Sequence, residues 1–222
     1  MCSSDLAMLA TVGALVVGIA IVVVLLLAGG NGSMAPVVAA DALVPPAELQ
    51  DGRSLGAADA PVSIEVYEDP QCPACGHWTR EIEPLLIASL VRDGTVRLTY
   101  KDFAFLGTES LDAAVAMRAV QQLGGSFWAM HALLFDNQHG ENKGAFSRER
   151  LATMAGMLGL DTAAFRALLD DQGLRDAVQA EIDEGRAIGV SQTPTLVIDG
   201  QLHPGAPAWE DLKQLVADAA AS

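Results

Sequence analysis

The sequence predicts an α/β fold in which a run of helices is inserted between two strand-forming segments. Residues 62–67 alternate apolar and polar side chains, residues 96–103 form a second β-prone run, and a helical pattern lies between them. This order predicts a strand–helix–strand unit with parallel strands and a right-handed crossover. From 109 to 186, alanine, leucine and methionine recur at helical spacing. A last strand at 195–198 then precedes a turn and an amphipathic helix at 208–220.

The N-terminal segment 6–28 is uncharged and almost wholly apolar. Its length suits the ~20 residues that a helix needs to cross a bilayer core, whereas a cleaved signal peptide has an apolar region of roughly 7–15 residues. We therefore expect a single transmembrane anchor at 6–28 rather than a cleaved leader or a buried soluble helix. Residues 29–52 are rich in Gly, Ala, Pro and Asp, which predicts a flexible linker between the membrane and the domain.

The composition excludes some partners. The chain has 222 residues, a formal charge of −15 and a pI near 4.4, which argues against binding to nucleic acid. Its three cysteines are too few for a disulfide-dense scaffold. No lysine or arginine precedes Arg53, so the positive-inside rule does not orient the predicted anchor.

Cys72 and Cys75 enclose Pro73 and Ala74 where the first strand passes into a helix. Unpaired N–H groups and the helix dipole favour an anion at a helix N-terminus, so the thiolate of Cys72 is favoured over the thiol. The pKa of such a cysteine can fall from about 8.5 to between roughly 3.5 and 7.5. Cys75 lies about one turn further along, close enough to form a disulfide with Cys72. The pair therefore predicts thiol–disulfide exchange.

Two other interpretations of the cysteine pair remain open. A zinc site requires further ligands, usually a second pair at similar spacing. The only other cysteine is Cys2, and no metal-binding spacing is present among His131, His139 and His203. A purely structural disulfide is the second alternative, but so small a ring constrains little of the unfolded chain. We expect a redox-active pair and no metal.

The helical segment is interrupted at Gly124-Gly125, at 137–144, at Gly159 and at Gly173, which predicts four or five short helices. Asp161 has the character of an N-cap. The methionine and phenylalanine side chains at helical spacing are expected to form a core. The alternative is that some of them line a groove for extended polypeptide.

Four motifs together resemble the DsbA-like branch of the thioredoxin superfamily: Glu-Asp-Pro-Gln-Cys-Pro-Ala-Cys (68–75), Tyr-Lys-Asp-Phe (100–103), Phe-Trp-Ala-Met-His-Ala-Leu-Leu-Phe (127–135) and Gly-Val-Ser-Gln-Thr-Pro-Thr-Leu-Val-Ile-Asp-Gly (189–200). The resemblance covers roughly residues 53–222. It implies a thioredoxin fold whose core, formed by 53–107 and 187–222, is interrupted by an all-helical subdomain at 108–186.

The resemblance also implies roles for individual residues. Cys72 would be the nucleophile and Cys75 would resolve the mixed disulfide, with no cofactor beyond this pair. Trans is the default for the peptide bond before Pro194 from the residues alone, but in the family this proline is cis and faces the disulfide. Thr193 would offer backbone hydrogen bonds to a bound substrate strand.

The chain departs from the family pattern at a position where many relatives carry a buried acid. Six residues before Cys72 the sequence has Val66, and the neighbouring Glu65 points to the opposite face of the strand. Either Glu68 or Lys101 takes the place of this acid in tuning the cysteine pair, or each is a solvated surface residue.

A second departure is the dipeptide Pro73-Ala74, because strong periplasmic oxidants of this family have Pro-His there. A histidine stabilises the thiolate and favours the reduced form, so alanine predicts a less oxidising couple. His77 either compensates in part or is merely exposed in the first helical turn.

These observations predict a membrane-anchored, single-pass thiol–disulfide oxidoreductase with its catalytic domain on the extracytoplasmic side. The resemblance implies reduced or unfolded secreted proteins as substrates and a membrane reoxidase of the DsbB or VKOR type. A monomer is expected, because no dimerisation segment is visible. The alternatives are a reductase or isomerase of extracytoplasmic disulfides, and a non-enzymatic chaperone or adaptor for unfolded chains.

Overall fold

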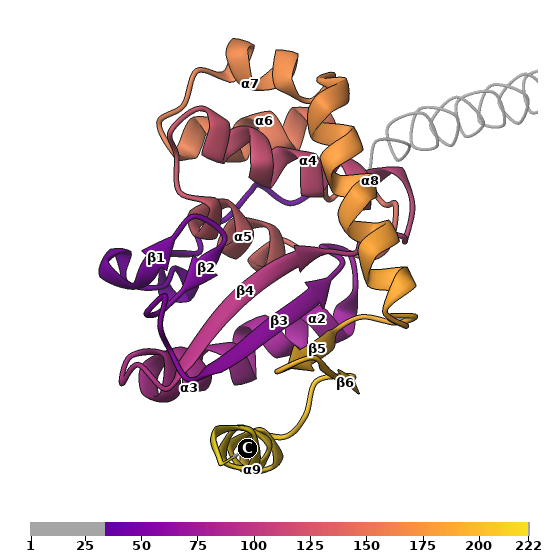
Figure 1. Ribbon diagram of the computed structural model, residues 1–222. Helices are drawn as coiled ribbons and strands as arrows, with labels where there is room; N and C mark the ends of the chain where they lie inside the picture. The colour runs from indigo at the N-terminus through magenta and orange to yellow at the C-terminus, as the bar shows by residue number, and fades with distance from the viewer. Residues whose placement is uncertain (1–33, 222) are drawn as a thin grey trace, which may run out of the picture. The chain divides into compact units, whose positions relative to one another are not determined.

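The computed structural model describes residues 34–221, which fold around one mixed sheet with the strand order β1-β2-β4-β3-β5-β6 (Figure 1). β3 and β4 are parallel, and the other neighbouring pairs are antiparallel. The strands are β1 (Gln50–Asp51), β2 (Ser54–Leu55), β3 (Val62–Glu68), β4 (Val96–Asp102), β5 (Thr195–Ile198) and β6 (Gln201–Pro204).

β3 is central because both of its edges are hydrogen-bonded. Val66 pairs with Tyr100 of β4 on one side and with Leu196 of β5 on the other. The side chains of all three residues are completely buried, as expected for a strand covered on both faces. The parallel β3–β4 pair confirms the predicted strand–helix–strand unit, and the C-terminal end of β3 sets the position of the cysteine pair.

Helical conformation follows the pair without interruption, as predicted between the two strands, but the hydrogen-bonding pattern changes along it. α2 (Pro73–His77) passes into a π-helical turn (Trp78–Ile82), then into α3 (Glu83–Leu86) and a second π-helical turn (Ile87–Val91). Pro84, which has no N–H to donate, lies in the first turn of α3. The π turns rotate α3 relative to a regular α-helix, so sequence periodicity alone does not give the faces of this segment.

The predicted helical insert is present as five helices within the described part of the chain. They are α4 (Thr108–Gln122), α5 (Phe127–Asp136), α6 (Arg148–Met157), α7 (Thr162–Leu168) and α8 (Gln172–Ala187). The predicted cap Asp161 accepts hydrogen bonds from the N–H groups of Ala163 and Ala164. The buried methionine and phenylalanine side chains of the insert confirm the predicted core.

The chain returns to the sheet after α8. Asp199 and Gly200 form the turn between β5 and β6 with φ values of 45° and 81°, as a tight hairpin turn requires. The closing helix α9 (Trp209–Ala220) buries Leu212 and Val216 and packs on β3 and β5. In Figure 1, α9 lies below the sheet and the helices of the insert lie above it.

The linker expected at 29–52 is wrong for its second half, because the folded unit begins at Pro36. Val38 exchanges two hydrogen bonds of 2.9 Å with the side chain of Asn137 at the end of α5. Gln50 in β1 accepts a hydrogen bond from Ser126 at 2.7 Å. Val38 thus satisfies both of its backbone groups against the insert, a contact that the Gly- and Pro-rich composition of the segment does not reveal.

The transmembrane anchor predicted at 6–28 lies outside the described residues. Between residues 34 and 221, no helix combines the length and the apolar character needed to cross a bilayer.

A buried ionic network joins the sheet to the insert. Asp102 at the end of β4 has no exposed surface and pairs with Arg118 of α4 at 2.7 Å and with Arg53 at 3.5 Å. Glu181 of α8 pairs with both arginines, at 3.0 Å and 2.5 Å. A carboxylate buried this deeply needs charged partners, because leaving it unpaired costs several kcal/mol.

We expect Arg118→Met to lower the free energy of unfolding by about 3 kcal/mol, because it leaves Asp102 with one arginine in place of two. Arg166→Met is the matched control, since Arg166 forms an exposed pair with Glu149 and such pairs contribute less than about 1 kcal/mol. Urea unfolding of both variants measures the difference. Equal losses in the two variants would contradict this interpretation of the network.

Candidate active site

The cysteine pair lies at the junction of β3 and α2. Cys72 is the N-cap residue of α2, Pro73 follows as its first residue, and Cys75 lies one turn along. The N–H of Gly76 donates to the carbonyl of Cys72 at 3.1 Å. Both cysteines are free thiols; Cys72 is 7% exposed and Cys75 is completely buried. Of these two cysteines, only Cys72 therefore keeps any surface that a second protein can reach.

The loop before β5 closes over the pair. The Thr193–Pro194 peptide bond is cis, as the resemblance implied, and the Cys72 thiol donates a hydrogen bond to the carbonyl of Thr193 at 3.3 Å. The carbonyl of Pro194 accepts a hydrogen bond from Gly205 at 2.8 Å. The structure thus brings together Cys72 and a loop that lies 121 positions away in the sequence.

The Cys72 thiolate is stabilised by its surroundings, which lower the pKa of the thiol to about 6. The largest cause is a hydrogen bond from the Cys75 thiol. Partial burial opposes this effect, while the Thr193 side chain and the backbone N–H groups of Cys75 and Ala74 lower the pKa further. These N–H groups are the unpaired donors of the first turn of α2, as predicted from the sequence.

Cys75 has the opposite environment. Burial raises the pKa of its thiol well above the ordinary value, and the hydrogen bond that it donates to Cys72 and the nearby Glu68 carboxyl raise it further. At neutral pH the pair therefore contains one reactive sulfur at the surface and one protonated sulfur behind it. This asymmetry is what disulfide exchange requires, because the thiolate is the nucleophile and the better leaving group.

Side chains of the insert hold the active-site turn. Gln138, after α5, donates to the carbonyls of Pro70 and Cys72 at 2.8 Å and 3.0 Å. Asp69 accepts four hydrogen bonds, from Gln71 N, Ser110 Oγ, Phe105 N and Leu106 N. Neither residue was predicted from the sequence. Gln138 lies in a stretch identified only as a break between helices. Asp69 belongs to Asp69-Pro70, which is a recognisable turn signal.

A cavity of about 430 Å³ adjoins the turn. It is bordered by Gln71 and Pro73 from the active-site turn and by Arg80, Phe135 and Gln138. The exposed Pro73 therefore lies between Cys72 and a hollow in the surface.

Four residues were expected to tune the cysteine pair: Glu65, Glu68, His77 and Lys101. The structure places only Glu68 beside the cysteines. Glu65 and Lys101 pair with each other at 3.3 Å, on the face of the sheet opposite Glu68. Lys101 also pairs with Glu184 at 3.3 Å. His77 is exposed on α2 and is not among the groups that lower the pKa of Cys72.

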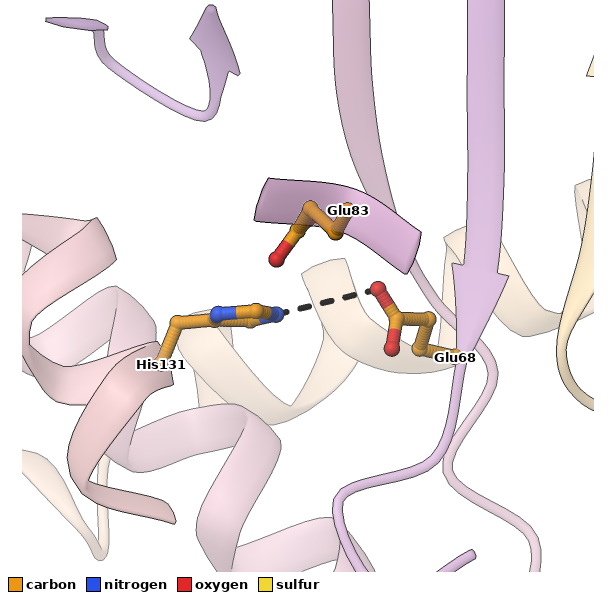
Figure 2. Close-up of side chains that lie close together, drawn as sticks. All are labelled: Glu68, Glu83 and His131. Carbon is orange, nitrogen blue, oxygen red and sulfur yellow. Dashed lines mark ion pairs between the residues drawn. The ribbon is translucent and has the colours of Figure 1, made fainter. Parts of the chain in front are cut away.

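Glu68, by contrast, is completely buried and is not a solvated surface residue. Two further titratable side chains lie beside it, Glu83 of α3 and His131 of α5, as Figure 2 shows. Burial is the first cause of all three pKa shifts: it raises the pKa of Glu68, raises that of Glu83 to about 8, and lowers that of His131. No local sequence pattern indicates this cluster, because its members come from three separate elements.

Known proteins resemble this chain over most of its length. A family model described as thioredoxin matches residues 48–218. The chain belongs to the thioredoxin family. The probable disulfide bond formation protein D of Bacillus cereus is 26% identical over 167 residues, which cover 74% of this chain and 76% of that protein. The crystal structure of oxidised BdbD from Bacillus subtilis has a fold similar to this one, with a TM-score of 0.71 and 21% identity, and the match covers 85% of this chain and 100% of that chain.

A further relative is the Na⁺/H⁺ antiporter NhaA 3 of Salinispora tropica, 30% identical over 183 residues. The match covers 81% of this chain but only 26% of the antiporter. Together with the asymmetric cysteine pair, these comparisons identify the chain as a DsbA-like thiol–disulfide oxidoreductase of the thioredoxin superfamily.

We expect the alkylation rate of Cys72 in the reduced protein to rise with pH and to reach half of its maximum near pH 6, the pKa that its surroundings give it. Iodoacetamide labelling measures the rate, and mass spectrometry of the peptide that contains Cys72 separates it from Cys2. Cys75→Ala removes the largest stabilising hydrogen bond and should move the midpoint toward the ordinary value of about 8.5. A midpoint above pH 8 in the unaltered protein would show that the thiolate is not stabilised.

Proposed function

We propose that this oxidoreductase forms disulfides in secreted proteins, while anchored to the extracytoplasmic side of the cell membrane by residues 6–28. The observation that carries the proposal is the contrast between Cys72, which is 7% exposed and whose thiol has a pKa of about 6, and the completely buried, protonated Cys75. A sulfur that is stable as a thiolate makes the reduced enzyme favourable and therefore makes its disulfide a good oxidant.

The reaction begins with the Cys72–Cys75 disulfide. A substrate thiolate attacks Cys72 Sγ, the bond between the two cysteines breaks, and Cys75 leaves as a thiolate that takes up a proton. A second substrate thiolate then attacks the substrate sulfur of the mixed disulfide and releases the Cys72 thiolate. The substrate loses two electrons and two thiol protons and gains a disulfide, and the enzyme is reduced to its dithiol form. No external cofactor takes part.

The site also suggests how a substrate is held. The backbone of Thr193 lies beside Cys72 and would pair with an extended substrate segment by β-augmentation. The cavity bordered by Pro73 and Phe135 would take a side chain of the same segment. Both features favour an unfolded or reduced chain as substrate.

Reoxidation would require a membrane partner of the DsbB or VKOR type that accepts the two electrons. An anchor at 6–28 would keep the monomeric domain close to this partner. The apolar character of 6–28 supports membrane attachment, and so does the similarity to part of an Na⁺/H⁺ antiporter.

Cys72→Ser is expected to abolish thiol–disulfide exchange, because it removes the nucleophile. Cys75→Ser should instead accumulate mixed disulfides with substrates, because the thiol that resolves them is missing. Non-reducing electrophoresis of cells that carry each variant distinguishes the two outcomes. If neither substitution alters exchange, or if partners remain bound when both cysteines are replaced, the protein acts as an adaptor for unfolded chains.

The reduction potential of the Cys72–Cys75 couple decides the direction of electron flow. The pKa of about 6 at Cys72 lies between those of thioredoxin, about 7, and DsbA, about 3.5. We therefore expect a potential between about −270 mV and −120 mV, measured by equilibration with glutathione. A value at the thioredoxin end would favour the reductase or isomerase alternative.

A further inference from the structure

The buried cluster of Glu68, Glu83 and His131 is built by three elements that are distant in sequence. Glu68 ends β3, Glu83 begins α3, and His131 lies in the middle of α5. One ligand-type atom from each lies within 4.8 Å of the other two. Figure 2 shows the two carboxylates and the imidazole ring pointing toward one common space.

The polar atoms around this space lack hydrogen-bond partners. Glu68 Oε1, Glu83 Oε1 and both ring nitrogens of His131 are buried and unpartnered. His131 Nε2 and Glu68 Oε1 are 3.7 Å apart, too far for a hydrogen bond. Buried polar groups are nearly always satisfied, so three side chains that each bring one such atom to a common space indicate a ligand that they share.

The cluster also lacks a compensating positive charge from the protein. Across residues 34–221, the ion pairs bring no lysine or arginine to Glu68 or Glu83. Glu68 is 0% exposed and Glu83 is 2% exposed. Two carboxylates this deep are stable only when neutralised, by protons or by a cation.

We propose that Glu68, Glu83 and His131 together bind one Zn²⁺ ion. One imidazole nitrogen and two carboxylates are ligands that zinc accepts, and the ion cancels the charge of both carboxylates. Zinc bonds of 2.0–2.2 Å place neighbouring ligand atoms roughly 3.3–3.5 Å apart in a tetrahedral site. The 3.7 Å separation of Glu68 and His131 is close to this value, and a rotation of the Glu83 carboxylate closes the remaining gap.

Thr79 Oγ1 already donates to Glu68 Oε2 at 3.5 Å, which leaves Oε1 for the metal. Glu83 makes no competing hydrogen bond through Oε1, so this oxygen is also available to the metal. The ion would tie the central strand and α3 to α5 of the insert, directly behind the cysteine pair. It would be a structural ion, because all three ligands are shielded from solvent.

The metal content of the full-length chain, purified in non-ionic detergent, tests the proposal. Both active-site cysteines are first replaced (Cys72→Ser and Cys75→Ser), so that zinc cannot be held by their thiols and the result does not depend on exchange activity. The protein is unfolded with a chelator, refolded with ZnSO₄ and desalted, and zinc is measured by mass spectrometry. We expect one zinc per chain, and a loss of at least about tenfold in zinc content on adding Glu83→Gln or His131→Asn.

Matched controls use exposed residues close in sequence to Glu83 and His131. Glu81→Gln and His139→Gln remove a carboxylate and an imidazole that lie at the surface, and both should retain the full zinc content. Equal zinc in the Glu83→Gln and Glu81→Gln proteins would place the ion elsewhere and overturn the proposal.

Thermal unfolding distinguishes zinc from protons as the neutralising species. Refolding with zinc at about 100 times its Kd should raise the unfolding temperature of the serine variant by about 5–10 °C over the chelator-treated protein. The same treatment should leave the Glu83→Gln protein unchanged, since glutamine imitates a protonated glutamate. If no zinc is retained and Glu83→Gln unfolds at the same or a higher temperature than its parent, protons neutralise the cluster and the zinc proposal is wrong.

Discussion

The chemistry of this protein depends on the different environments of two sulfur atoms one helical turn apart. Cys72 caps α2 and faces the Thr193 carbonyl, whereas Cys75 has no exposed surface. The S–H of Cys75 is the main stabiliser of the Cys72 thiolate, and the same hydrogen bond raises the pKa of Cys75. This hydrogen bond couples the two shifts. Burial is the larger cause of the raised pKa of Cys75, and the backbone N–H groups at the helix N-terminus add to the lowered pKa of Cys72.

The insert contributes to this site as well as covering it. Gln138, just after the C-terminal end of α5, donates hydrogen bonds to the carbonyls of Pro70 and Cys72. Ser110 of α4 donates to the Asp69 carboxylate, which also accepts from the backbone of the turn. His131 reaches the end of β3 from the same helix that precedes Gln138. A βαβ unit alone would leave the turn that carries Cys72 with fewer fixed contacts, so the insert helps to hold the nucleophile in place.

Local patterns in the sequence predicted much of this fold and the reactive pair. Alternating apolar residues predicted β3, helical spacing predicted the insert, and Asp199-Gly200 predicted the turn between β5 and β6. Each of these signals is contained within a few neighbouring residues. The packing of residues 36–52 was not predicted, because it depends on Asn137 and Ser126 in a distant part of the chain. The role of Gln138 at the active-site turn was not predicted for the same reason, because its partners are also distant in the sequence.

The sequence by itself determined that a Cys-Pro-Ala-Cys turn would follow a strand and begin a helix, because turn chemistry and periodicity act over short distances. Only the tertiary structure decided what surrounds the two sulfurs. It placed Thr193 against Cys72, buried Glu68 and paired Lys101 with Glu65. It also brought Glu83 and His131 to Glu68. These long-range contacts depend on strand order and helix packing, which no single stretch of the chain encodes.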